Sequence, residues 1–373
     1  MALVKCQTVV NILEELAPKR LAESWDNVGL LVGDGRQEVR RIMVCLDVPE
    51  WVVDEAIEKK VDMIIAHHPI IFSGIKKVNN DTVLGRKLLK LIKNNIQVYC
   101  CHTNYDIAAG GLNDILTEHF GFSKHEVIEI TNQEKLYKLV VYVPINHEEK
   151  VFDAMLRAGA GHIGNYSACS FRIAGKGTFK PEAGSSPFIG SVNKLEEVDE
   201  YRVETIATEK VLGKVIREML KAHPYEEAAY DIYELVNKGQ AQGVGRLVTL
   251  DKEISLANLA ENVKKALSID TVKLAGSKDR KVGKLAILNG TGNKFINAAY
   301  FAGAQVLITG DMQHHETLDA LELGMSVIDA GHYATEKLMI KAVSEYLNNK
   351  LRDLKYDVDI TESATNLEPM EYI

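Results

Sequence analysis

The sequence predicts an α/β fold, with a body of mostly parallel or mixed sheets that is interrupted by an α+β insertion domain. Three observations support this prediction. Apolar, strand-like runs alternate with helical patterns in the first third of the 373 residues, and the same alternation returns in the last quarter. The middle of the chain has a different order of elements. The length suits two or three domains better than one core.

The two flanking parts, residues 1–130 and 241–373, are expected to form the α/β body. In the first part the pattern predicts strands at 41–47, 61–66 and 96–101 and helices at 50–60, 82–94 and 111–120. In the second part it predicts strands at 284–288, 305–309, 325–329 and 356–360 and helices at 293–301, 312–323 and 333–348. Strands that alternate with helices indicate βαβ units and a mostly parallel sheet.

Residues 131–240 follow another order. Strands are predicted at 136–143, 167–179, 200–208 and 229–236, and helices at 148–158 and 211–222. The order β-α-β-β-α-β is that of the ferredoxin-like split unit. We interpret this segment as an insertion between two halves of one body, because ligand-type residues occur in both flanks. A tandem of three domains is the alternative.

Composition excludes several classes of protein. The chain is 46% hydrophobic and 26% charged, with a net charge of -8, which is typical of a soluble globular protein. No basic cluster appears, so nucleic acid is not an expected partner. No apolar run approaches the roughly 20 residues that span a membrane, and no signal-peptide pattern begins the chain, so a cytoplasmic location is expected. Five cysteines without a Cys-x-x-Cys pair argue against disulfides and against a thiolate zinc site.

Polar side chains follow several predicted strands. In open α/β folds, chemistry gathers at the carboxyl ends of strands. The residues in question are His67, His68, Asp106, His332 and Glu336. The alternatives are a polar strand cap for the histidine pair, a helix N-cap or Asx turn for Asp106, and an exposed i,i+4 pair for His332 and Glu336.

Taken together, these five residues predict a metal site. Nitrogen and oxygen ligands without thiolate suit zinc, manganese, iron or cobalt. Five protein ligands are too many for one tetrahedral ion. They suit two divalent metal ions that share a carboxylate, with zinc as the first choice. Paired ions about 3.5–4 Å apart activate water in hydrolytic enzymes.

Other polar groups are candidates for supporting roles. Asp311, His314 and His315 follow another strand and are predicted to orient ligands or transfer protons, with a solvated helix start as the alternative. The segment Ser24-Trp25-Asp26-Asn27 is predicted to place an aromatic ring and two polar groups at the mouth of the site, unless the tryptophan is only packed in a turn.

Two further motifs are less specific. Gly290-Thr291-Gly292 is either a phosphate cradle at a helix N-terminus or a tight turn, and the turn is favoured. His223-Pro-Tyr-Glu-Glu227 is either a metal-binding segment or a helix end stopped by Pro224, and the helix end is favoured.

Several of these motifs, in this order, resemble the Nif-three-like family, whose bacterial members are commonly called GTP cyclohydrolase 1 type 2 homologues. The matching segments are Ser24-Trp-Asp-Asn-Val-Gly-Leu30, Ala66-His-His-Pro69, His102-Thr-Asn-Tyr-Asp106, Gly310-Asp-Met-Gln-His-His-Glu316 and Asp329-Ala-Gly-His-Tyr-Ala-Thr-Glu336. The segment 223–227 and its surroundings resemble the PII/CutA-like insertion of longer members.

The resemblance implies a dinuclear site at the five ligands above, with Glu336 bridging the two ions. It also implies a toroidal homohexamer whose sites face an internal cavity. The implied activity is that of a metal-dependent hydrolase that acts on a nucleotide or another small phosphorylated molecule, for example by opening the purine ring of GTP. The alternative is a non-catalytic, metal-responsive regulatory or binding assembly, in which the insertion is the sensor.

Overall fold

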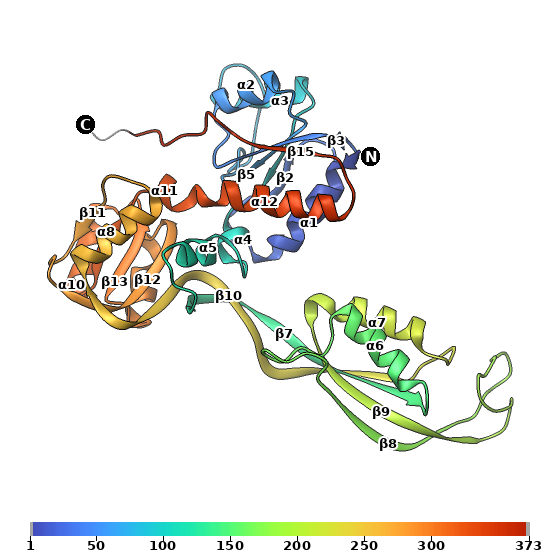
Figure 1. Cartoon of the computed structure of the whole chain (residues 1–373). Helices are drawn as coiled ribbons and strands as arrows, with labels where there is room; N and C mark the ends of the chain where they lie inside the picture. Colours follow the sequence, from blue (N-terminus) through green and yellow to red (C-terminus); the bar gives the residue numbers. More distant parts are fainter. Residues whose placement is uncertain (1–2, 371–373) are drawn as a thin grey trace. The chain divides into compact units, whose positions relative to one another are not determined.

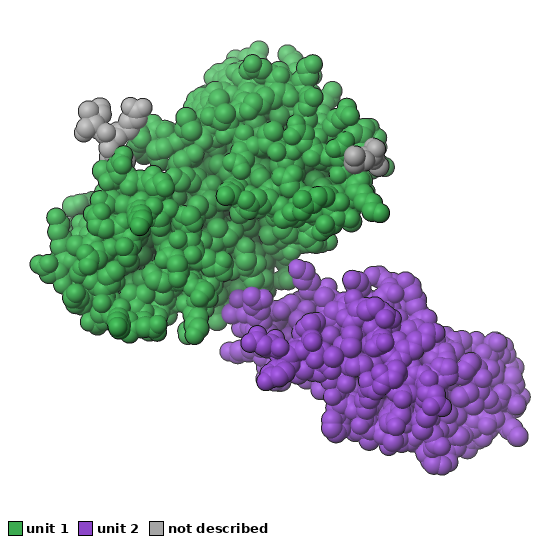
Figure 2. Space-filling model, in the orientation of Figure 1, with its two compact units in different colours: residues 1–132, 242–373 green, residues 133–241 purple. Residues whose placement is uncertain are grey.

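The computed structural model describes residues 3–370. The chain divides into two compact units, which are shown in different colours in Figure 2. Unit 1 comprises residues 1–132 and 242–373, and unit 2 comprises residues 133–241. The fold is mixed α/β with both parallel and antiparallel strand pairs. Within residues 3–370, no helix is long and apolar enough to cross a bilayer.

The first sheet of unit 1 has five strands. Their order is β15 (Asp359–Glu362), β4 (Arg41–Cys45), β5 (Met63–Ala66), β6 (Gln97–Cys100) and β2 (Gly29–Val32). The first four are parallel to one another, and β2 runs antiparallel to β6. The parallel strands therefore end at the same edge of the sheet.

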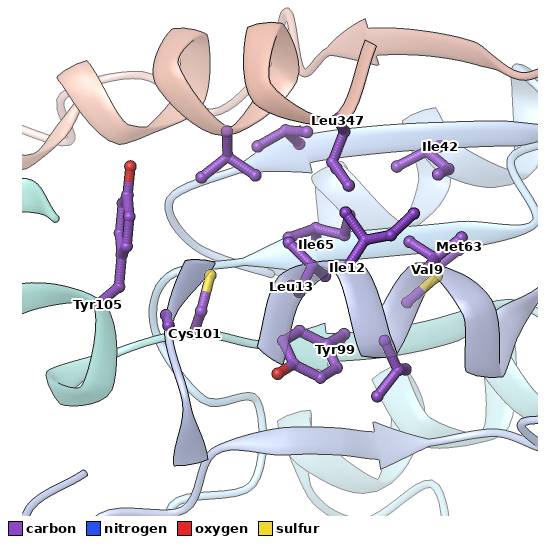
Figure 3. Close-up of a cluster of buried hydrophobic side chains, with 14 of the residues drawn as sticks. Val9, Ile12, Leu13, Ile42, Met63, Ile65, Tyr99, Cys101, Tyr105 and Leu347 are labelled. Atoms are coloured by element: carbon purple, nitrogen blue, oxygen red, sulfur yellow. The ribbon is translucent and has the colours of Figure 1, made fainter. Parts of the chain in front are cut away.

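Helices cover both faces of this sheet (Figure 1). One face packs against α1 (Cys6–Leu16) and α12 (Leu338–Asp353), and the other against α2 (Glu50–Glu58) and α3 (Val83–Lys93). The side chains of β4 alternate between the two cores, with Ile42 in the first and Met43 in the second. Figure 3 shows the first core, where Leu13 and Leu347 meet Ile65. Because such a strand is buried on both faces, its sequence is an unbroken run of apolar residues.

The second sheet of unit 1 repeats the arrangement. Its strands lie in the order β11 (Lys273–Ala275), β14 (Ser326–Asp329), β13 (Val306–Gly310), β12 (Lys281–Thr291) and β10 (Tyr230–Ser255). The three central strands are parallel, and the outer two are antiparallel to their neighbours. One face packs against α5 (Leu112–His119) and α8 (Leu256–Leu267), and the other against α9 (Ile296–Phe301) and α10 (His314–Glu322).

Short elements complete unit 1. They are β1 (Val4–Lys5), η1 (Lys19–Leu21), β3 (Glu38–Val39), α4 (Thr103–Ile107), η2 (Asn293–Phe295) and α11 (His332–Glu336). The helix predicted at 333–348 is therefore two helices, α11 and α12, which meet at Lys337.

The C-terminal segment of unit 1 is fastened by one buried carboxylate. Glu55 accepts hydrogen bonds from Ser363 Oγ, from the backbone N–H of Ala364 and from both the N–H and the hydroxyl of Thr365. The next residue, Asn366, accepts bonds from the backbone N–H groups of residues 46 and 47. Residues 363–366 therefore lie beside α2 and the segment that follows β4.

Unit 2 contains the middle elements. They are the larger part of β7 (Glu126–Pro144), α6 (Glu148–Ala158), β8 (Ser170–Phe179), β9 (Glu196–Thr208), α7 (Glu209–Ala222) and the first part of β10. The strands lie in the order β10-β7-β9-β8, and β9 pairs antiparallel with both neighbours. Helices α6 and α7 pack on one face, over Leu139, Val141 and Val203. The strands β7 and β10 are much longer than the predicted 136–143 and 229–236, because backbone pairing continues through mainly polar residues that a hydrophobic pattern cannot detect.

Candidate metal centre

The carboxyl ends of strands from both sheets of unit 1 supply one cluster of polar side chains. His67 and His68 follow β5, and His332 and Glu336 lie on α11, directly after β14. Asp106 lies on α4, after β6. The turn into α11 uses Gly331, whose φ of 84° lies in the left-handed region that glycine adopts without strain.

Glu336 lies at the centre of the cluster. Its Oε2 is 3.0 Å from His68 Nε2 and 3.0 Å from His332 Nε2, and its Oε1 is 3.7 Å from His67 Nε2. The Nε2 atoms of His68 and His332 are 3.3 Å apart. Asp106 Oδ1 lies 3.6 Å from His67 Nε2. The carboxylate therefore faces three imidazole nitrogens at once.

Two buried atoms of this cluster lack a hydrogen-bond partner. They are His67 Nε2 and Glu336 Oε2; the two imidazole nitrogens 3.0 Å from Oε2 are close enough for an ion pair but are not oriented to donate a hydrogen bond to it. Leaving a buried polar atom unsatisfied costs about 1–3 kcal/mol. An imidazole nitrogen and a carboxylate oxygen are both good ligands for a divalent ion, so a cation fits this position.

The other ring nitrogen of each histidine is held by a second group. His67 Nδ1 is 2.8 Å from the carbonyl oxygen of Cys101, and His68 Nδ1 is 2.7 Å from Asp47 Oδ1. The same arrangement recurs twice: His102 Nδ1 is 2.9 Å from Asp26 Oδ1, and His332 Nδ1 is 3.0 Å from Asp311 Oδ2. Such partners fix the ring orientation and the tautomer, and they leave Nε2 available as a ligand.

The carboxylates of Asp106 and Glu336 accept hydrogen bonds from the same side-chain amide, that of Asn289. Asn289 Nδ2 donates to Asp106 Oδ1 over 2.9 Å and to Glu336 Oε1 over 3.2 Å. The next residue, Gly290, has a φ of 59°, and a Cβ there would lie 2.3 Å from Glu336 Oε1. The glycine in the Gly290-Thr291-Gly292 turn is therefore required by the close approach of a carboxylate.

The protonation of the cluster is strongly perturbed. Burial opposes a charge on His68, yet the carboxylates of Asp47 and Glu336 raise its pKa to about 10. Burial also opposes a charge on His67, but Asp106 and Glu336 raise its pKa as well. Burial disfavours the ionised form of Glu336, and the imidazoles, His67 foremost, hold its pKa well below its usual range. A bound cation would therefore replace protons on these imidazoles.

The structure brings all five predicted ligands together and adds a sixth residue. Two groups have ligand atoms within 4.8 Å of one another: His67 with His68 and His102, and His68 with His332 and Glu336. His102 was not among the ligands predicted from the sequence, although it begins the segment His102-Thr-Asn-Tyr-Asp106 that resembles the family. The available signal was that β6, like β5 and β14, is followed by a histidine.

Asp311, His314 and His315, which were predicted to orient ligands or transfer protons, have different surroundings in the structure. Asp311 contacts the cluster through His332 and therefore orients that ring. His314 and His315 are exposed in the first turn of α10, where their rings lie 5.3 Å apart. Among residues 3–370, neither has a hydrogen bond or an ion pair with the cluster.

Two cavities open onto the cluster. The first, of about 390 Å³, is lined by Trp25, His102, Asp106, Lys294 and Glu336, among others. Trp25 is half exposed, and the ammonium of Lys294 lies 5.6 Å from its ring centroid. The predicted placement of Trp25 at the mouth of the site agrees with this geometry. The second cavity, of about 300 Å³, is lined by Asp47, His68, Asp311, His332 and Glu368, among others.

His223 of unit 2 has a structural role. It directly follows the last residue of α7, in agreement with the helix end that was favoured for this motif. Its Nε2 is 2.9 Å from the carbonyl oxygen of Tyr142, and its Nδ1 accepts a bond from the backbone N–H of Tyr225. With both nitrogens engaged, His223 is not available as a metal ligand.

Comparisons with known proteins agree over the whole chain. The sequence pattern of the Duf34/NIF3 (NGG1p interacting factor 3) family matches residues 4–369. Proteins named GTP cyclohydrolase 1 type 2 homolog are 44% identical over 373 residues in Halalkalibacterium halodurans and 45% identical over 370 residues in Bacillus subtilis. The first match covers 100% of this chain and 100% of the relative, and the second covers 99% of each.

Solved structures give the same result. A Bacillus cereus protein related to NIF3 has a TM-score of 0.93 and 42% identity, and the match covers 100% of both chains. The Staphylococcus aureus protein SA1388 has a TM-score of 0.74 and 30% identity, again with 100% of both chains covered.

Proposed function

The chain belongs to the DUF34/NIF3 family, and from the geometry of its cluster we propose that it binds two divalent metal ions and acts as a metal-dependent hydrolase. The proposed substrate is a nucleotide or a related small phosphorylated molecule. The observation that carries the proposal is the convergence of imidazole Nε2 atoms on the Glu336 carboxylate, with His67 Nε2 and Glu336 Oε2 buried and without hydrogen-bond partners.

The proposed ligands are His67, His68, Asp106, His332 and Glu336. Glu336 suits a bridging role because its two oxygens face different imidazoles, Oε1 toward His67 and Oε2 toward His68 and His332. When bound, paired metal ions lower the pKa of water and stabilise negative charge that develops on oxygen. Zinc is proposed first, with iron, manganese or cobalt as alternatives.

The residues around the ligands prepare them for this role. The Nδ1 partners keep the histidine Nε2 atoms directed into the cluster, and Asn289 fixes the orientation of both carboxylates. Asp311 positions His332 in the same way. Proton exchange with solvent is assigned to His314 or His315, which lie on the helix that follows Asp311. Both rings are exposed, so each can exchange protons with solvent.

The cavity beside Trp25 supports the choice of substrate. An exposed indole offers a stacking surface to an aromatic base, and the ammonium of Lys294 offers a positive charge to a phosphate. Its volume of about 390 Å³ lies within the range of small-molecule sites.

Unit 2 supports a second candidate function, a metal-responsive regulatory assembly. It has a cavity of about 600 Å³ of its own, which the hydrolase proposal does not use. We propose that unit 2 is a PII/CutA-like, ferredoxin-like insertion, because its strand order and paired helices suit that arrangement.

We also propose a closed homo-oligomer, a toroidal hexamer first. Support comes from exposed apolar side chains on the strands of unit 2, such as Phe171, Tyr233 and Val236. Light scattering gives the mass directly, and a monomeric mass would reject this part of the proposal.

One experiment separates the two functions. The metal-loaded protein is incubated with nucleotides, GTP included, and with a metabolite extract, while native mass spectrometry counts the bound ions. Glu336→Gln is the comparison variant. Two ions together with turnover that the variant lacks would support the hydrolase. Two ions without turnover of any compound would favour the regulatory candidate, and the absence of bound metal would reject both.

A further inference from the structure

The cavity in unit 2 lies on the face of the sheet opposite α6 and α7. Val141 and Val203 pack under the helices, whereas their neighbours Tyr142 and Arg202 line the cavity. Successive strand residues point to opposite faces, so the cavity occupies the face that the helices leave open. The loop between β8 and β9 forms part of its wall through Pro181, Ser185, Pro187, Phe188 and Ile189. We propose that this cavity binds a small organic cation.

The floor of the cavity is made of small residues. Ala174, Gly175 and Gly177 of β8 line it, and Gly175 pairs with Glu200 of β9. A Cβ at Gly177 would lie 2.2 Å from Glu200 Oε2. The glycine therefore leaves room for a carboxylate against the strand backbone.

Aromatic rings form the walls. The ring centroid of Tyr225 lies 5.8 Å from that of Phe179 and 6.3 Å from that of Phe188. Tyr142 lines the same cavity. Aromatic faces attract a cation, and several rings around one space are the usual way in which proteins bind organic ammonium groups.

The charges that line the cavity are unbalanced. Arg202 forms an ion pair with Glu204 through one terminal nitrogen, although its buried Nε has no hydrogen-bond partner, and Lys176 forms an ion pair with Glu197, so each of these two cations has one carboxylate partner outside the lining. Glu200, Glu226 and Glu227 also line the cavity. Across residues 3–370, none of these three carboxylates has a cationic side chain within ion-pair distance. The cavity therefore has an excess of negative charge.

Glu200 is the most buried of the three carboxylates that lack a cationic partner, with only 8% of the residue exposed. Its Oε1 accepts a bond of 3.0 Å from the hydroxyl of Tyr225, and no cation neutralises its charge. A buried charge is costly unless it is paired, so an occupant that supplies a positive charge would be stabilised here. A metal ion is a poorer fit, because the groups of residues 3–370 that could hold a metal do not include Glu200.

Calorimetry on the full-length protein tests the proposal with three organic cations: choline, spermidine and benzylamine. The matched neutral ligand for choline is 3,3-dimethyl-1-butanol, which has the same shape without the charge. At least one cation is expected to bind saturably at millimolar concentration. If choline binds, the neutral analogue should bind about tenfold more weakly or worse. Binding should persist with a metal chelator present, since the proposal does not depend on the metal centre.

Two variants locate the binding. Glu200→Gln should weaken the cation by about tenfold, and Gly177→Ala should weaken it because the new methyl group displaces the carboxylate. Glu218→Gln is the control, because it removes an exposed charge from α7 outside the cavity. Circular dichroism verifies that each variant is folded. The proposal would be overturned if none of the cations bound, if the neutral analogue bound as well as choline, or if two folded cavity variants bound like the parent protein.

Discussion

Asp47 provides the sharpest test of the metal centre, because it touches a proposed ligand without being one. Its Oδ1 lies 2.7 Å from His68 Nδ1. We expect Asp47→Asn to weaken metal binding, since an asparagine oxygen still accepts the bond from Nδ1 but no longer adds negative charge that strengthens the ligand. Loss of such a partner costs about tenfold to a hundredfold in affinity.

The structure favours the lower end of that range. The Asp47 side chain is 47% exposed, so solvent screens its charge. A tenfold loss corresponds to about 1.4 kcal/mol. Asp47→Ala removes the hydrogen bond as well as the charge, so it should cost more than Asp47→Asn. This order of the two variants separates the charge of Asp47 from its orienting role.

Metal affinity is measured by competition with a chromophoric zinc chelator at one fixed pH. Asp34→Asn is the matched control, because Asp34 is an exposed carboxylate that binds Arg36 away from the cluster. The reasoning would be refuted if both Asp47 variants bound zinc as tightly as the control. In that case His68 would not be a ligand that Asp47 orients.

Further predictions concern stability, binding and catalysis. Burial opposes ionisation of Glu55, but hydrogen bonds from Lys59 and the C-terminal segment lower its pKa from 4.5 to about 2. Ionised Glu55 therefore stabilises the folded protein fully above pH 4.5, and this stabilisation is lost as the pH falls toward 2. Chemical unfolding should show Glu55→Gln to be up to about 3 kcal/mol less stable near neutral pH, with a gap that closes in acid. Gly290→Ala should reduce metal content in mass spectrometry, because the methyl group would displace Glu336 Oε1; normal content would contradict this. If the protein is a hydrolase, Trp25→Ala should raise KM by about tenfold through lost stacking and leave kcat nearly unchanged. The double variant of His314 and His315 to alanine should keep both metal ions and lose turnover, and unchanged turnover would exclude them from proton transfer.

The five proposed ligand positions could be picked out from the sequence because each depends on local sequence. A buried strand is an apolar run, and a histidine or carboxylate directly after it stands out, as at His67 and His332. In a parallel sheet, such positions meet at one edge whatever the details of packing. The family resemblance pointed to the same residues.

The partners of these ligands could not be predicted in the same way. Asp26 reaches His102 from a turn 76 residues earlier, and Asn289 reaches Asp106 across 183 residues. Their sequence surroundings resemble ordinary turns, and only tertiary packing brings them to the cluster. His314 and His315 also follow a strand in the sequence, but packing leaves both on an exposed helix turn, so their proposed role in proton exchange depends on the kinetic test and not on a contact with the cluster.

The fastening of the C-terminal segment bears on the order in which the metal centre can be assembled during synthesis. His67, His68 and Asp106 leave the ribosome first, followed by the whole of unit 2, before His332 and Glu336 appear. Asn366, which holds the backbone beside Asp47, emerges later still. A nascent chain therefore carries half of the cluster for most of its synthesis. We expect zinc to be retained by ribosome-bound chains only when an added C-terminal linker carries residue 366 beyond the exit tunnel, and zinc retained by chains arrested before residue 332 would contradict this order.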